Sequence, residues 1–258
     1  MGGAEDKVDR REVLERFVRE AGGPRARIAI LPTASAVPEE TAAFYQKVFA
    51  EIGVEASAHV PIVSREDADA GSHAAAIAGA TGVFLTGGDQ SRLVDVLSGT
   101  ASFRALRERL VEGGVLAGTS AGASAFSSTM IVGGETGLQV RRDGVRLAPG
   151  LGIITRLIID QHFSQRKRFG RLLAAAALEP KRLGVGIDEN TAIVYYGDGR
   201  LEVIGSGQVF VLDASQASAG AHDRPADAAP LTLSGVVLHV LAPGDCFDVA
   251  ARRLLPPS

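Results

Sequence analysis

One short stretch of the chain, VLAGTSAGAS, ends an apolar run in small residues around Ser120. The pattern Gly118-Thr119-Ser120-Ala121-Gly122 allows a sharp strand-to-helix turn that would expose the Ser120 hydroxyl as a nucleophile. The same turn would bring the Ala121 N–H close to an oxyanion formed on a substrate. Because the chain contains 31 glycines, the pattern alone is equally compatible with a structural turn.

A serine nucleophile requires a base, and the sequence offers five histidines. His162 follows the apolar stretch LIID at the predicted end of a strand, where α/β proteins collect functional groups. His239 lies inside VVLHVL and is typical of a core histidine. We therefore predict that His162 is the general base.

The base in turn requires an acid that orients it. Asp188 and Glu189 follow another apolar stretch, LGVGI, and either carboxylate can hold the imidazole tautomer. The residues leave this choice open. An α/β-hydrolase order would need a set such as Ser120, Asp213 and His239, which would require a histidine from a strand interior.

Several cations follow the candidate base directly. Arg166, Lys167, Arg168 and Arg171 fall at the start of a predicted helix over Ser164–Pro180. Guanidinium groups bind carboxylates in a bidentate manner, so the arginines predict an acidic substrate. For Lys167 we expect a solvated surface position.

The stretch TGGDQ closes a further predicted strand. Its Gly88 can bring a backbone N–H to a ligand, and with Ala121 it would complete an oxyanion hole. We expect Asp89 to cap the following helix and Gln90 to contact substrate.

Alternating strand and helix patterns fill the first half of the chain and predict a mostly parallel sheet with helices on both faces. Helices are expected from near Glu5 and over Pro38–Gly53, the second with Phe44, Val48 and Ile52 on one face. Successive strands over Arg182–Asp213 add an antiparallel part. The simplest organisation is a single α/β domain over residues 1–258, with a long loop at Ser215–Pro230.

The composition of the chain excludes several classes of function. The net charge of -3 gives no indication of nucleic-acid binding. The single cysteine, Cys246, excludes an intrachain disulfide and a cysteine-based zinc site, and no cofactor or metal is expected. No apolar run is long enough to cross a membrane, and charges occupy the place of a signal peptide. We therefore expect a cytoplasmic protein without membrane association.

Five stretches occur in order between Gly2 and Ala192: GGAEDK, FLTGGDQ, GTSAGA, DQHFSQRKRFGRL and GIDENTA. Together they resemble the cyanophycinases, within the serine peptidase family that also holds aspartyl dipeptidase. The resemblance implies a Ser120–His162–Glu189 triad, and it thereby favours Glu189 over Asp188. It also implies substrate contacts at the following residues: Gln90, Asp160, Arg166, Arg168 and Arg171.

The resemblance also implies a substrate and a fold. The substrate would be cyanophycin, a polyaspartate backbone that carries arginine on each β-carboxyl, and the product of this exopeptidase would be β-aspartyl-arginine. The implied fold is similar to class I glutamine amidotransferases, usually as a homodimer. The family pattern has a strand before GGAEDK that this sequence lacks.

Three alternatives remain open. The chain is also compatible with an aspartyl dipeptidase acting on small Asp-X peptides, although the several arginines favour the polymer. An inactive relative that binds the polymer is disfavoured by the complete Ser, His and Glu set. A glutaminase-type amidotransferase would need a cysteine at the turn, and Cys246 is far from it in the sequence.

Overall fold

The computed structural model describes residues 1–219 and 230–256. They divide into two compact units, Glu5–Ala125 and a second unit made of Met1–Ala4 and Phe126–Ser258. His222 and most of the predicted loop at Ser215–Pro230 lie outside the described residues. The organisation as one domain over residues 1–258 stays a prediction.

The unit Glu5–Ala125 is built on a parallel sheet with the strand order β2-β1-β3-β4. β1 lies in the centre, and its Ile28–Leu31 pairs in register with Gly82–Leu85 of β3. The bounds of its strands are β1 Arg27–Leu31, β2 Ala56–His59, β3 Gly82–Leu85 and β4 Val115–Gly118. The predicted parallel sheet is confirmed in this unit.

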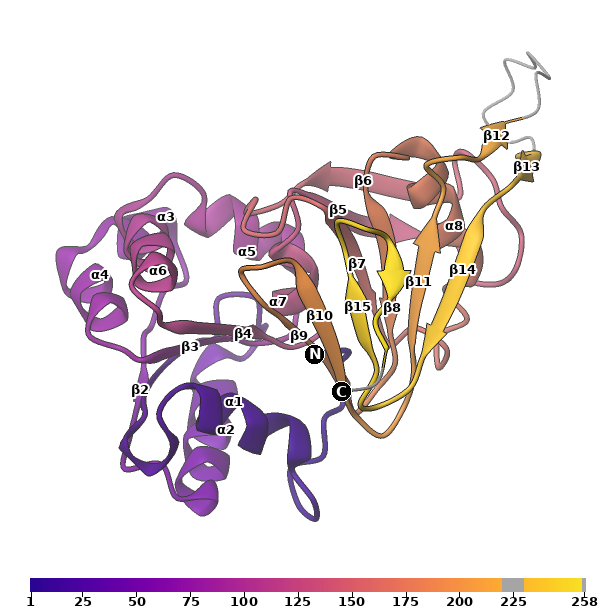
Figure 1. Ribbon diagram of the computed structural model, residues 1–258. Coiled ribbons are helices and arrows are strands. Elements are labelled where there is room, and N and C mark those ends of the chain that lie inside the picture. Colours follow the sequence, from indigo (N-terminus) through magenta and orange to yellow (C-terminus); the bar gives the residue numbers. More distant parts are fainter. Residues whose placement is uncertain (220–229, 257–258) are drawn as a thin grey trace. The chain divides into compact units, whose positions relative to one another are not determined.

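Helices cover both faces of this sheet, with α1 and α2 on one face and α3, α4 and α6 on the other (Figure 1). This too agrees with the prediction. The bounds are α1 Glu12–Glu20, η1 Gly23–Arg25 (a short 3-10 helix), α2 Pro38–Ile52, α3 Arg65–Asp69, α4 Gly71–Ala78, α5 Gln90–Leu97, α6 Ala101–Val111 and α7 Ala121–Ala125.

An aromatic cluster fills the space between α1, α2 and the sheet. The rings of Phe17, Tyr45, Phe49 and Phe84 pack at centroid distances from 4.6 to 6.2 Å, which is typical of tilted and edge-to-face contacts. Of the residues predicted to share one face of α2, Val48 is buried, whereas Phe44 is 48% exposed. The adjacent position Tyr45 carries the buried face of α2 instead.

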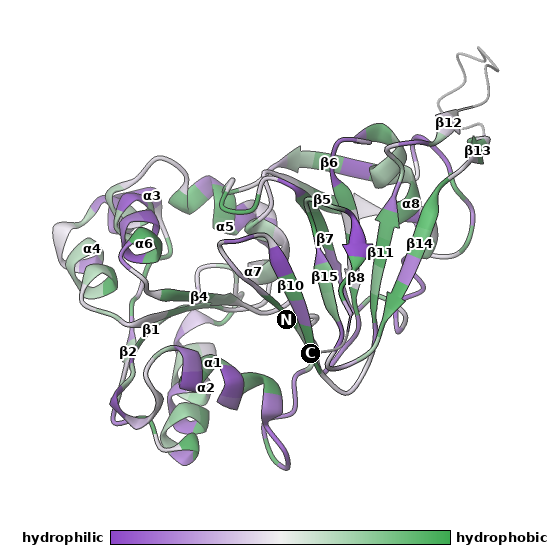
Figure 2. Cartoon of the chain, in the orientation of Figure 1, coloured by the Kyte–Doolittle hydropathy of each residue, from purple (hydrophilic) through white to green (hydrophobic). Residues whose placement is uncertain are grey.

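The second unit contains a mixed sheet and an antiparallel sheet. In the mixed sheet, of order β14-β11-β8-β7, β7 and β8 are parallel neighbours, and β11 and β14 add antiparallel strands (Figure 1). The other has the order β16-β15-β10-β9. Figure 2 shows long hydrophobic stretches on β11 and β14. The antiparallel part predicted from the sequence is confirmed.

The remaining bounds complete this unit. They are β5 Thr129–Gly134, β6 Val145–Pro149, β7 Leu157–Gln161, α8 Phe169–Leu178, β8 Leu183–Ile187, β9 Thr191–Tyr195, β10 Arg200–Gly205, β11 Val209–Asp213, β12 Ser218–Ala219, β13 Leu233–Ser234, β14 Val237–Leu241, β15 Cys246–Asp248 and β16 Arg253–Leu254. Met1–Ala4 contains no strand. Gly2 and Gly3 form hydrogen bonds instead to His162 after β7, to Asn190 after β8 and to Thr191 at the start of β9.

Two helices begin later than predicted. The helix expected from Ser164 begins only at Phe169, because Lys167 takes a left-handed φ of 53° that no α-helix tolerates. The helix expected near Glu5 begins at Glu12. There the Asp6 carboxylate accepts the N–H groups of the next residues and holds them in a turn.

The helices of the described residues differ from membrane-spanning helices in length and in apolar character. None of them combines the length and the apolar character that crossing a bilayer requires.

Candidate functional site

Ser120 lies at a tight turn between β4 and α7. Its φ of 52° is left-handed, which is uncommon for a residue with a side chain and marks local strain. A Cβ atom on Gly118 would come within 3.0 Å of the Gly122 backbone, and one on Gly122 would come within 3.0 Å of the Leu85 carbonyl. Strand and helix are therefore packed so closely that both glycines of the motif are required, as in a nucleophile elbow.

A buried carboxylate supports the residue before Ser120. Glu5, 3% exposed, accepts hydrogen bonds from Thr119 Oγ1 at 2.7 Å and from the Tyr45 hydroxyl at 2.5 Å. Burial raises the pKa of Glu5, but the Lys7 ammonium and these two hydrogen bonds outweigh it, so the pKa is lowered overall. Glu5 therefore carries a stable negative charge beneath the turn.

The loop after β3 lies next to the same turn. A Cβ atom on Gly87 would be 3.4 Å from Ser120 Cβ, so this backbone approaches the serine closely. Gly88 has a φ of 140°, and Asp89 accepts hydrogen bonds from the N–H groups of Ser91 and Arg92. The predicted Asp89 cap is thereby confirmed, and Gln90 is the first residue of α5.

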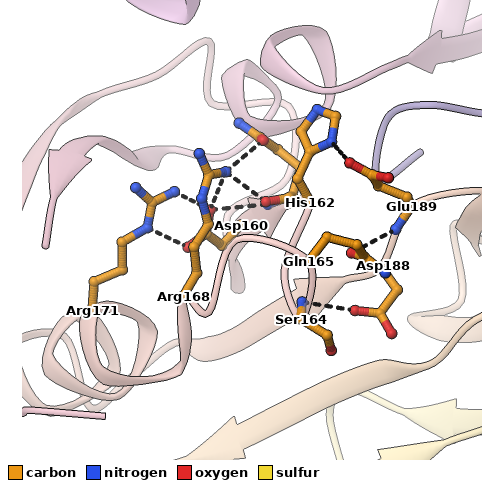
Figure 3. Close-up of polar contacts among 9 residues, drawn as sticks. Asp160, His162, Ser164, Gln165, Arg168, Arg171, Asp188 and Glu189 are labelled. Carbon is orange, nitrogen blue, oxygen red and sulfur yellow. Dashed lines mark hydrogen bonds and ion pairs between the residues drawn. The ribbon is translucent and has the colours of Figure 1, made fainter. Parts of the chain in front are cut away.

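His162 and Glu189 are joined directly in the second unit. His162 Nδ1 lies 2.6 Å from Glu189 Oε1, and Figure 3 shows the two side chains pointing toward one another. Because β7 and β8 are parallel neighbours, the residues after them meet at one sheet edge. The imidazole is therefore oriented by a carboxylate through Nδ1, and Nε2 is the ring nitrogen that does not contact Glu189.

The neighbouring Asp188 has a different role. Its carboxylate accepts the backbone N–H of Ser164 at 2.9 Å and that of Gln208 at 3.3 Å. The Gln165 side chain accepts the N–H of Glu189 at 3.1 Å, as Figure 3 shows. These bonds tie the two loops together. Of the two acids that the sequence left open, Glu189 is the one that contacts the histidine.

The environment of His162 keeps its imidazole neutral. Burial is the main cause of a lowered pKa, and the positive charges of Arg166 and Arg168 lower it further. The hydrogen bond and charge of Glu189 act in the opposite direction but do not outweigh them. A neutral imidazole at neutral pH is the form that accepts a proton.

The predicted substrate-binding residues of this unit form an ion-pair cluster. Arg171 donates to both oxygens of Asp160, at 2.7 Å from Nε and 2.5 Å from Nη2. Arg168 Nη1 reaches Asp160 and both the side-chain and the backbone oxygens of Gln161. Figure 3 shows both guanidinium groups converging on Asp160. This carboxylate is 1% exposed, so the Asp160–Arg171 pair is a buried structural element of the site.

Arg168 retains capacity for a further partner. Its Nε is buried and has no hydrogen-bond partner among the residues that the structure describes. The pKa of Arg168 is lowered to about 10, mainly by burial and also by the charges of Arg171 and Arg166. The Asp160 charge offsets this shift only in part. An anionic ligand beside Arg168 would compensate the excess positive charge. Arg166 itself is exposed beside the cluster.

Three residues of this arrangement were missed by sequence reasoning. Glu5 lies within GGAEDK, a stretch that contributes to the family resemblance but does not indicate a role for this carboxylate. Gln161 lies between two assigned residues, and its position at a strand end was the available signal. Gly3, whose backbone carbonyl accepts the N–H of Asn190, gave no chemical signal at all.

Known proteins similar to this chain carry the name cyanophycinase. The cyanophycinase of Trichormus variabilis (strain ATCC 29413 / PCC 7937) is 43% identical over 99% of this chain and 86% of its own length. That of Synechococcus elongatus is 38% identical over 100% of this chain and 82% of its own. The cyanophycinase of Geminocystis herdmanii (strain PCC 6308) is 41% identical over 96% of this chain and 92% of its own length.

Solved structures agree with the fold. A peptidase from an acI-B1 Actinobacterium has a TM-score of 0.70 at 24% identity, covering 95% of this chain and 94% of that one. At this identity the likeness describes the fold alone. Residues 1–203 of the chain match the peptidase family S51. Together with the relatives above, this match shows that the chain belongs to peptidase family S51.

Proposed function

We propose that the chain is a serine exopeptidase that hydrolyses cyanophycin and releases β-aspartyl-arginine. The observation that carries the proposal is the match to cyanophycinases along nearly the whole chain. The substrate and product follow from the family resemblance described above. The His162–Glu189 contact supports the same chemistry, because it supplies an oriented neutral base.

In the proposed reaction, Ser120 Oγ attacks the carbonyl of a backbone amide between two aspartates. His162 Nε2 accepts the hydroxyl proton while Glu189 stabilises the imidazolium through Nδ1. The C–N bond then breaks, and His162 gives the proton to the leaving amine. Water attacks the acyl-enzyme with the same base, which frees the acid product and restores Ser120.

Two backbone N–H groups are proposed to stabilise the oxyanion, those of Gly88 and Ala121. Ala121 directly follows the nucleophile, and the Gly87–Gly88 loop runs close to the Ser120 side chain. Donors fixed in the backbone stabilise the developing charge without reorganising. No metal ion enters this reaction.

The substrate carboxylates are proposed to bind the arginines. The half-buried Arg168 and the exposed Arg166 supply the direct contacts. Asp160 holds Arg168 in place and is itself held by Arg171, since Asp160 accepts hydrogen bonds from both arginines. Gln90 is proposed as a further hydrogen-bond partner of the substrate.

We further propose that the two compact units act as one peptidase domain, since the family match spans both. The resemblance supports a homodimer, and the single cysteine fits a cytoplasmic protein. Light scattering on the purified chain would measure the oligomeric state directly.

The test is incubation with purified cyanophycin, followed by mass spectrometry for β-aspartyl-arginine. Small Asp-X dipeptides are offered in parallel. We expect dipeptide release from the polymer, and Ser120→Ala should lower kcat by at least about 10³-fold while the protein stays folded. Ser98→Ala, at the end of α5 in the same unit, is the matched control and should retain full activity.

The other possible outcomes would each indicate a different function or mechanism for this chain. Turnover of Asp-X dipeptides alone would identify an aspartyl dipeptidase. Binding of cyanophycin without any cleavage would identify an inactive binding relative. Full activity in Ser120→Ala would exclude the serine mechanism.

A further inference from the structure

We infer that the segment Gly2–Gly3 is a positioning element for the His162 imidazole, and that Gly3 must be glycine for this purpose. The inference rests on the proposed function of His162 as the general base. Its evidence lies within one compact unit, which holds Met1–Ala4 together with both loops concerned.

The backbone of this segment ties the base and acid loops together. His162 N–H donates to the Gly2 carbonyl at 2.8 Å, and Asn190 N–H donates to the Gly3 carbonyl at 3.0 Å. Gly2 N–H in turn donates to the Thr191 carbonyl at 2.8 Å. Two adjacent residues thus bond to the loop of His162 and to the loop of Glu189, at sequence distances that no local structure could bridge.

Gly3 also lies close to the Cε1 and Nε2 atoms of the His162 imidazole. A Cβ atom on Gly3 would lie within 3.0 Å of both Cε1 and Nε2 of His162. Nε2 is the nitrogen that does not contact Glu189. The imidazole is therefore held between Glu189 on one edge and the bare Cα of Gly3 on the other.

Two further features show that the fit is close. Gly3 is buried and has a φ of 92°, in the region that favours glycine. His162 itself has a left-handed φ of 47°. A loop in such a conformation persists only where its surroundings hold it, and the Gly2 hydrogen bond is one of these constraints.

The variant Gly3→Ala tests the contact. Its added methyl group would push the imidazole away from its position, and a misplacement of about 1 Å costs about 100-fold in rate. We expect kcat to fall by about 100-fold with KM nearly unchanged, because no substrate-binding group moves.

Gly199→Ala is the matched control. Gly199 lies in the same unit, in the hairpin between β9 and β10, and its φ of 89° almost equals that of Gly3. A Cβ atom there would meet nothing within 4 Å. Both variants therefore impose the same backbone strain, and only one of them crowds the histidine.

NMR supplies a readout that does not depend on activity. In the wild-type protein, a nuclear Overhauser effect should connect the Gly3 Hα protons with His162 Hε1. In Gly3→Ala, the Nδ1 proton resonance of His162 should shift or broaden, and in Gly199→Ala it should stay unchanged. The wild-type measurement remains decisive if Gly3→Ala does not fold.

The outcomes separate this inference from the proposed function. If His162→Ala abolishes activity while Gly3→Ala retains wild-type kcat and an unchanged Nδ1 resonance, the positioning role is refuted and the base assignment stands. Absence of the wild-type Overhauser effect would refute it equally. If His162→Ala stays active, the proposed function fails instead.

Discussion

His162 Nδ1 contacts Glu189 at 2.6 Å, while the adjacent Asp188, which carries the same functional group, bonds to backbone N–H groups instead. The two acids follow the same strand, and their side chains leave it in different directions (Figure 3). The orientation of the base and the stability of its loop are thus assigned to separate carboxylates.

Because Glu189 is the carboxylate that orients His162, we predict a severe catalytic defect in Glu189→Gln. The amide can no longer stabilise the imidazolium and favours the wrong tautomer, so kcat should fall by about 10⁴-fold, as for the comparable change in serine proteases. Steady-state kinetics with cyanophycin measures the effect. Glu202→Gln, which removes a carboxylate bonded to Tyr196 in the same unit, should retain kcat. Comparable kinetics for the two variants would contradict the orienting role of Glu189.

The pKa of His162 should lie below its ordinary value of 6.5, with burial as the main cause. Activity should therefore persist below pH 6.5 and fall only when the imidazole becomes protonated. Between the lowered pKa and 6.5, His162 is protonated more in the unfolded chain than in the folded one. Its contribution to the unfolding free energy therefore rises with pH. Titration of the His162 resonances by NMR measures the midpoint.

Arg166 contributes to this shift through its charge, so Arg166→Gln should raise the pKa of His162. Lys167→Gln removes a neighbouring exposed cation that does not appear among the causes of the shift, and it should leave the midpoint in place. Equal titration midpoints in Arg166→Gln and the wild type would show that this charge does not act on the imidazole.

Asp160→Asn should destabilise the fold as well as impair catalysis. The change leaves the guanidinium of Arg171 buried without its anion, which costs about 3–5 kcal/mol in unfolding free energy. Urea unfolding followed by circular dichroism measures the loss. Asp143→Asn breaks the exposed pair with Arg141, which solvent screens, and should cost far less unfolding free energy than Asp160→Asn. If both variants unfold alike, the Asp160–Arg171 pair has no special structural role.

Glu5→Gln should weaken the support beneath the serine turn. The neutral amide replaces a charged acceptor of two hydrogen bonds, so we expect a loss of about 1–3 kcal/mol at neutral pH. Because the pKa of Glu5 is lowered in the fold, its contribution is present above 4.5 and is lost as the pH falls through the folded pKa. Unfolding experiments at neutral pH and below 4.5 measure both effects.

The matched variant for this network is Tyr45→Phe, which removes one donor and keeps the charge of Glu5. It should reduce the slope of stability against pH near 4.5 only in part, because the Lys7 charge and the Thr119 hydrogen bond still lower the pKa of Glu5, whereas Glu5→Gln should remove the contribution of Glu5 altogether. A wild-type slope in Glu5→Gln would mean that other carboxylates control the acid sensitivity.

Much of this architecture was readable from local patterns. The helix over Gln90–Leu97 and its Asp89 cap follow from capping chemistry and from apolar residues at helical spacing. The residues Ser120, His162 and Glu189 stand out because each follows an apolar strand and carries reactive chemistry. Such signals depend on residues within one turn or strand, which the sequence displays directly.

Other features depend on contacts between distant segments. The choice of Glu189 over Asp188 is made by a contact across 27 residues, and that of Glu5 with Thr119 spans 114. The late start of α8 at Phe169 follows from the left-handed backbone of Lys167, which helix propensity does not reveal. A glycine such as Gly3 carries no side chain whose chemistry could be read.

Residue patterns alone therefore identify the family, the reactive residue types and the strand ends on which they lie. The tertiary structure decided which carboxylate reaches the histidine, that Arg171 is committed to Asp160, and that Gly3 lies against the imidazole. The physical reason is that residue type and spacing encode local conformation. Side-chain partners are selected only when burial forces each polar group to find a donor or acceptor in a distant part of the chain.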